Sequence, residues 1–161
     1  MFNTKTKNVE ETQALAASIA ELVIAKDVLL LVGDLGAGKT AFTQGFGKAL
    51  GVGEPITSPT FTLAKSYSGR LTLNHLDVYR IEDLEEVRDL ALPELLEGEA
   101  VTLIEWGDQI VPSIPQNYLE IRFEYGQEDD HRIVKISHIG SSWHKRIEQL
   151  QGALSEWSIK Q

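Results

Sequence analysis

The N-terminal part of the chain shows three successive hydrophobic patterns. Residues 2–7 alternate in polarity, which predicts an edge strand. Asn8 and Glu11 have the spacing of a capping box, and the apolar positions after them recur at helical spacing. This predicts a helix over residues 9–25 whose apolar side packs on a sheet. A continuous apolar run, VLLLV at 28–32, then predicts a β-strand.

The middle of the chain is predicted to form a pair of strands. Residues 61–67 and 71–79 alternate in polarity, and a tight turn at 68–70 joins them. The apolar positions shift phase after Asn74, which indicates either a bulge or the point where the second strand leaves the sheet. Three polar side chains then share one face of this strand: His75, Asp77 and Tyr79.

The remaining pattern predicts helices and a hairpin. Residues 81–98 form an acidic helix that breaks before Pro93 and restarts with this proline at a first helical position. The apolar run at 101–104 is typical of a buried parallel strand. Residues 118–125 and 131–139 predict a hairpin.

The tail, residues 141–161, is predicted to be a C-terminal amphipathic helix over 141–159. Its stripe packs on the same domain or on a partner, and the first is favoured. The stripe consists of Trp143, Ile147, Leu150, Leu154 and Trp157.

Directly after the VLLLV run comes GDLGAGKT at 33–40, which fits the pattern Gly, any four residues, Gly-Lys-Ser/Thr. Glycines let backbone amides wrap around a phosphate, and the following helix, over 40–50, aims its positive end at the anion. Lys39 can reach the β- and γ-phosphates, and the Thr40 hydroxyl can bind Mg²⁺. The predicted nucleotide contacts are Asp34, Leu35, Gly36, Ala37, Gly38, Lys39, Thr40 and Ala41.

A glycine-rich turn that ends in Lys-Thr by chance is the alternative, but the order of strand, loop and helix favours phosphate binding. The order of strand, loop and helix also predicts an α/β fold. We expect a single P-loop NTPase domain over residues 1–161, with a central, mostly parallel sheet, flanking helices and antiparallel hairpins.

Two acids, Asp77 and Glu105, end apolar strands. Phosphoryl chemistry needs an acid that holds Mg²⁺ and a group that orients the nucleophile, so these two are the candidates, and surface acids are the alternative. The hydroxyl-rich segment at 57–60 either senses the γ-phosphate as a switch or is an ordinary turn stiffened by Pro59.

Composition narrows the function. The chain has 161 residues, no cysteine and a net charge of −9. Thiolate metal sites and thiol nucleophiles are excluded, and the negative charge argues against extensive direct contact with tRNA or other nucleic acid. The start lacks the apolar segment of a secretory signal and no run approaches a membrane span, so a soluble, cytoplasmic protein is expected.

The chain resembles the TsaE family, formerly YjeE, small bacterial P-loop ATPases needed for the threonylcarbamoyladenosine modification of tRNA. The resemblance covers nearly the whole chain. It lies in four motifs in the family's order: GDLGAGKT at 33–40, SPTF at 58–61, HLDVYR at 75–80 and LIEWGD at 103–108.

The resemblance implies a Mg²⁺-dependent ATPase, weak alone, that works with the TsaD and TsaB proteins and resets their complex between turnovers. It implies that Lys39 and Thr40 bind phosphate and Mg²⁺, that Glu105 is the magnesium acid and that Asp77 is essential for hydrolysis. It further places Trp106 near the nucleotide. The switch loop would consist of Ser58, Pro59, Thr60 and Phe61.

The main alternative is a P-loop small-molecule kinase. Such kinases close an arginine-bearing lid over the phosphates, and the central region offers only Arg70, Arg80 and Arg88. A GTPase is disfavoured because no Asn-Lys-x-Asp is present, and a scaffold that does not hydrolyse ATP is disfavoured because both acids are present.

Overall fold

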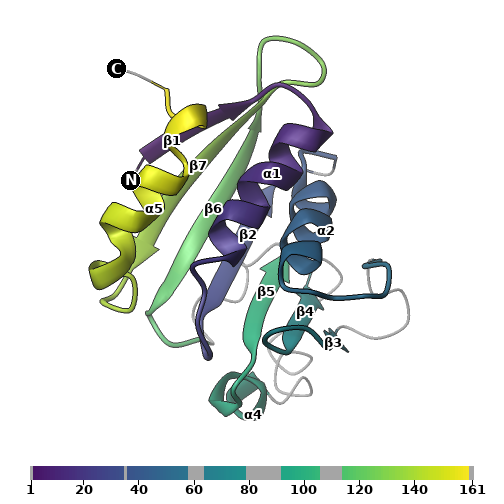
Figure 1. Ribbon diagram of the computed structural model, residues 1–161, viewed down its shortest axis with the longest axis vertical. Helices are drawn as coiled ribbons and strands as arrows, with labels where there is room; N and C mark the ends of the chain where they lie inside the picture. The colour runs from purple at the N-terminus through teal and green to yellow at the C-terminus, as the bar shows by residue number, and fades with distance from the viewer. Residues whose placement is uncertain (1, 35, 58–63, 79–91, 106–113, 160–161) are drawn as a thin grey trace.

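The computed structural model of the protein describes residues 2–34, 36–57, 64–78, 92–105 and 114–159. The described residues form a seven-stranded sheet with the order β1-β7-β6-β2-β5-β4-β3 (Figure 1). The four central strands are parallel, and antiparallel strands flank them on both sides. The predicted α/β sheet is therefore confirmed. In chain order its strands are β1 Phe2–Thr6, β2 Val28–Gly33, β3 Ala64–Tyr67, β4 Leu73–Asp77, β5 Val101–Glu105, β6 Tyr118–Tyr125 and β7 Arg132–Ile139.

Apolar side chains cover both faces of the central strands. Helices α1 (Val9–Ala20) and α2 (Lys39–Ala49) lie side by side on one face (Figure 1). Leu29 and Leu31 of β2 pack in the core cluster of that face. Val28 and Leu30 of the same strand belong to a second cluster, which includes Leu92 of α4 (Leu92–Glu97). This burial on both faces explains why β2 is a continuous apolar run.

Helix α1 begins as predicted but ends five residues early. The Asn8 side chain accepts a hydrogen bond from the Glu11 amide at 2.8 Å, which confirms Asn8 as the helix cap. The helix ends at Ala20 because the next residues turn toward β2. In that turn the Asp27 carboxylate accepts the Ile24 amide at 2.8 Å.

Strand β4 has neither the bulge nor the exit from the sheet that was expected after Asn74. Its pairing with β3 and β5 runs without interruption from Leu73 to Asp77, so no bulge follows Asn74. The strand lies inside the sheet with both faces covered, and its apolar positions therefore need not alternate. The connection from β3 spans 68–72 and is longer than the predicted tight turn. His75 and Asp77 share the face that carries α2.

Within the described residues, helix α4 spans Leu92–Glu97, so Pro93 lies in a helix, as expected. The acidic helix expected before it falls mostly on residues 79–91, which lie outside the described residues, as does Tyr79. The predicted hairpin is confirmed by the antiparallel pairing of β6 and β7.

The tail is not one helix. It consists of a 3-10 turn at His144–Arg146, helix α5 at Ile147–Ala153 and a second 3-10 turn at Ser155–Trp157. The expected packing on its own domain is confirmed, because the apolar stripe faces inward. Its buried members are Trp143, Leu150, Leu154 and Trp157, with Ile147 packed beside them.

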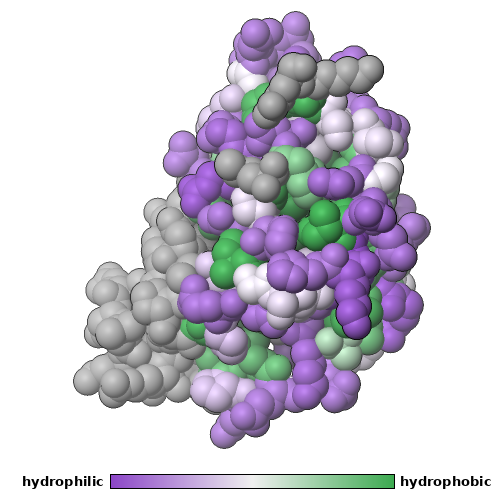
Figure 2. Space-filling model, turned by 90° about the vertical axis from the view of Figure 1, so that its left-hand side faces the viewer, coloured by the Kyte–Doolittle hydropathy of each residue, from purple (hydrophilic) through white to green (hydrophobic). Residues whose placement is uncertain are grey.

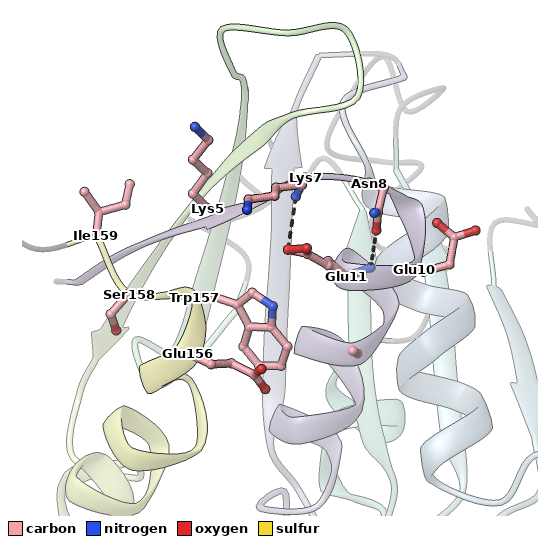
Figure 3. Close-up of a pocket in the computed structure, with 10 residues that line it drawn as sticks. Lys5, Lys7, Asn8, Glu10, Glu11, Glu156, Trp157, Ser158 and Ile159 are labelled. Carbon is pink, nitrogen blue, oxygen red and sulfur yellow. Dashed lines mark hydrogen bonds between the residues drawn. The ribbon is translucent and has the colours of Figure 1, made fainter.

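After its last turn the tail meets the outer edge of β1. Thr4 forms a bridge with Ser158, and the Ile159 amide donates to the Asn3 carbonyl. A groove remains between β1, the start of α1 and the tail, and the Trp157 side chain extends toward α1 there (Figure 3). The tail thus covers part of an edge strand that would otherwise expose unpaired backbone groups.

Figure 2 shows a side of the molecule on which hydrophilic residues predominate and hydrophobic ones form separate small patches. The arrangement agrees with the net charge of −9. Among the residues that the structure describes, no helix is long and apolar enough to cross a membrane.

A buried ion pair joins the tail to the loop before β2. The Arg146 guanidinium donates to both oxygens of Asp27, at 2.6 and 2.9 Å, and to the carbonyls of Leu22 and Ser142. It also lies 3.8 Å from the centre of the Trp143 ring.

Replacing Arg146 with alanine is expected to lower the free energy of unfolding by about 3 kcal/mol, because it leaves the Asp27 carboxylate buried without its cation. Urea unfolding measures the change. Arg122→Ala is the matched control, since its ion pair with Glu120 is much more exposed and should contribute less than about 1 kcal/mol. Equal losses in the two variants would contradict the structural role given to Arg146.

Candidate functional site

The loop between β2 and α2 has the shape of a phosphate cradle. The Ala37 amide donates to the Asp34 carbonyl at 3.0 Å, which closes a tight turn. Gly36 and Gly38 have φ angles of 80° and 121°, a region that favours glycine. At Gly33 a side chain would meet the Phe123 carbonyl oxygen at 2.9 Å. Each of these three positions therefore favours glycine for a local physical reason.

Helix α2 begins directly after this loop. Its cap residue is Gly38, which has no side chain that could accept hydrogen bonds from the amides of the first turn. Amides at such a helix start need acceptors, and together with the helix dipole they form an anion site. Thr40 in the first turn is exposed, and Ala41 beside it is partly buried.

Lys39 is held against the loop. The residue is only 6% exposed, although lysine is rarely buried. Its ammonium group donates to the carbonyls of Gly33 and Asp34. These contacts fix the positive charge at the place where the backbone turns, so little side-chain freedom remains to be lost when an anion binds.

The two candidate acids end neighbouring strands. Glu105 of β5 is paired in register with Leu31 of β2 on one side and with Asp77 of β4 on the other. All three strands are parallel, so these ends meet at the sheet edge from which the glycine loop starts, the usual ligand edge of such sheets. The structure thus brings Asp77, Glu105 and Lys39 to one edge.

Glu105 is buried, with 4% of the residue exposed. One of its oxygens, Oε1, lies 3.5 Å from the Thr43 hydroxyl on α2 and 3.5 Å from Nε2 of His75 on β4. The Thr43 hydroxyl also lies 2.9 Å from the Lys39 carbonyl, to which it donates. The carboxylate is therefore linked to the helix that carries the lysine.

Several predicted site residues lie outside the described residues: Leu35, Trp106, and Ser58, Pro59, Thr60 and Phe61 of the expected switch loop.

The structure adds residues that the sequence did not single out. Arg132, at the start of β7, lies 4.7 Å from the centre of the Tyr125 ring, measured from its guanidinium carbon. Its guanidinium group also donates to the Gly36 carbonyl at 3.4 Å. The β6–β7 hairpin therefore braces the tip of the glycine loop. No local motif marks this pair, because the contact arises only when β6 is paired beside β2.

The residues of this site fit a nucleotide phosphate with Mg²⁺. The helix start and the lysine supply donors for an anion, while Thr40 and Glu105 supply oxygen ligands. The described residues contain no group of three or more acidic, histidine or cysteine side chains that could hold a metal alone. This donor set suits Mg²⁺, which keeps several waters and shares its coordination with substrate phosphates.

Comparison with known proteins identifies the family. The family described as "Threonylcarbamoyl adenosine biosynthesis protein TsaE" matches residues 6–134. The chain belongs to the TsaE family. The matched region contains the glycine loop and both candidate acids, and it ends within β7, before the tail. The resemblance that four short motifs indicated is therefore confirmed over most of the chain.

Individual members of the TsaE family are similar over most of their length. The tRNA threonylcarbamoyladenosine biosynthesis protein TsaE of Bacillus subtilis is 44% identical over 147 residues, which cover 91% of both chains. The protein of the same name from Treponema pallidum is 40% identical, over 69% of this chain and 82% of its own. A crystal structure of Bacillus subtilis YdiB superimposes with a TM-score of 0.78 and 39% identity, over 93% of each chain.

Proposed function

We propose that this protein is a Mg²⁺-dependent ATPase, built as one domain, that supports threonylcarbamoyladenosine modification of tRNA. The observation that carries the proposal is the convergence of Lys39, Glu105 and Asp77 at one sheet edge, beside an uncapped helix start. Membership of the TsaE family and the names of its relatives support the biosynthetic role.

Each residue has a distinct task in the proposed reaction. The loop amides from Asp34 to Ala41 bind the phosphates, and Lys39 neutralises the β- and γ-phosphates. Thr40 holds Mg²⁺ directly, and Glu105 holds it through water. When bound, Mg²⁺ supplies electrostatic stabilisation of the phosphate charge. Asp77 orients the attacking water and accepts its proton.

Two further sites complete the proposal from the family resemblance. The SPTF segment at 58–61 acts as a switch loop, and Trp106, directly after Glu105, lies close to the nucleotide. Both are proposals that rest on their positions in the motifs.

The proposed partners are the TsaD and TsaB proteins. In this scheme they carry out threonylcarbamoyl transfer, and ATP hydrolysis resets their complex between turnovers. The net charge of −9 supports a division of labour in which the partners, and not this protein, provide the extensive contact with tRNA.

Purified protein should hydrolyse ATP slowly alone and faster with purified TsaB and TsaD, as phosphate release measures. Lys39→Met should abolish both rates. Turnover that ignores the partners while a small metabolite becomes phosphorylated would instead support the kinase alternative. One observation already disfavours a lid role for Arg70, which donates to the carbonyls of Ala20 and Val23 at the end of α1.

A further inference from the structure

His75 is an unusual residue for its surroundings. It is only 1% exposed, on the face of β4 that packs toward α2. Within the part of the chain that the structure describes, neither of its ring nitrogens has a hydrogen-bond partner. Leaving such a group unsatisfied costs stability, so an apolar residue would serve the fold better. A buried polar group of this kind calls for an explanation outside packing.

His75 lies beside the carboxylate of Glu105. The distance of 3.5 Å from Nε2 to Oε1 is slightly too long for a good hydrogen bond. Thr43 approaches the same oxygen from α2, also at 3.5 Å. Contacts at active sites are often long without ligand and shorten in the complex. Among the described residues, both of these contacts to the carboxylate are made by Oε1.

We propose that His75 is a positioning residue for Glu105. Its Nε2–H donates to Oε1 and holds the carboxylate so that Oε2 is presented to the water shell of Mg²⁺. The Thr43 hydroxyl contacts the same oxygen from α2, while its single hydrogen is donated to the Lys39 carbonyl. We call these two contacts, one from the sheet and one from α2, the clamp on Glu105. The inference rests on the proposed function, because it assigns a support to the proposed magnesium acid.

The clamp predicts which variants keep the metal site. A glutamine places its amide nitrogen where Nε2 of histidine lies, whereas an asparagine places it where Nδ1 lies. His75→Gln should therefore retain the donor to Glu105, and His75→Asn should lose it. Both variants replace the imidazole ring by a polar amide, so a purely structural role would predict similar losses in the two.

The test measures the Mg²⁺ concentration needed for half-maximal binding of a fluorescent, non-hydrolysable ATP analogue. His75→Asn should raise this concentration by about tenfold or more, the usual effect of losing an outer-shell partner. His75→Gln should stay within about twofold of wild type. In EDTA, where only the phosphate cradle acts, all three proteins should bind the analogue equally.

His138→Asn is the matched control. This histidine on β7 also has a buried Nδ1 without a hydrogen-bond partner among the described residues, but it lies outside the candidate site. Its variant should keep the wild-type Mg²⁺ requirement. His75→Phe is a second variant without a donor, which fills the space with apolar atoms in case His75→Asn does not fold.

The outcomes separate this inference from the proposed function. A wild-type Mg²⁺ requirement in the folded donor-less variant, or equal loss in His75→Asn and His75→Gln, overturns the positioning role alone. A wild-type protein that binds no analogue, or binds it without regard to Mg²⁺, overturns the proposed function and this inference with it.

Discussion

Replacing Lys39 with methionine is expected to weaken ATP binding by about 1,000-fold. The ammonium group is held at the glycine loop by two backbone carbonyls, so its charge is already in place before a phosphate arrives. A charge-assisted hydrogen bond contributes about 1.5–3 kcal/mol. Two such bonds from the ammonium group to the β- and γ-phosphates would account for about 4 kcal/mol of the binding free energy. Each 1.4 kcal/mol corresponds to a tenfold change in affinity.

Titration with a fluorescent ATP analogue measures the loss. Methionine keeps most of the apolar stem of the side chain, so the packing of α2 changes little. Lys48→Met is the matched control, because this lysine lies in the last turn of the same helix and is exposed. It should bind the analogue as wild type does. Unchanged affinity in Lys39→Met would remove the assignment of the loop as a phosphate site.

The sequence predicted the glycine loop and its strand and helix because their physics is local. Gly36 and Gly38 are needed for the backbone path, and VLLLV reports a strand buried on both faces. The approach of Asp77 to Glu105 was also foreseeable, since residues at the ends of parallel strands meet at one edge.

Other features depend on pairings that no local pattern contains. The contact between Arg132 and Gly36 needs β6 beside β2, and the clamp on Glu105 needs α2 packed over β4 and β5. The tail was expected as one helix because its apolar positions repeat at helical spacing. The residues before α5 instead form a 3-10 turn, which ends at Arg146, the partner of Asp27 in the ion pair.

Replacing Asp77 with asparagine is expected to leave nucleotide binding nearly unchanged and to lower partner-stimulated ATP hydrolysis by about 1,000-fold. Asp77 is the register partner of Glu105, so it lies beside the proposed magnesium acid. Asparagine retains the shape but cannot accept a proton from water, and a lost general base costs about 10²–10⁴ in rate.

Two measurements separate the effects of Asp77→Asn. Analogue binding with Mg²⁺ should stay within a few-fold of wild type, while phosphate release with TsaB and TsaD should fall by about 1,000-fold. Asp130→Asn, the same change at an exposed turn position, is the control and should be silent in both. Wild-type turnover in Asp77→Asn would transfer the role of orienting water to another residue, with Glu105 as the next candidate. A large loss of Mg²⁺-dependent binding would instead make Asp77 a metal ligand. The analogue is not hydrolysed, so a residue that acts only in hydrolysis would leave its binding unchanged.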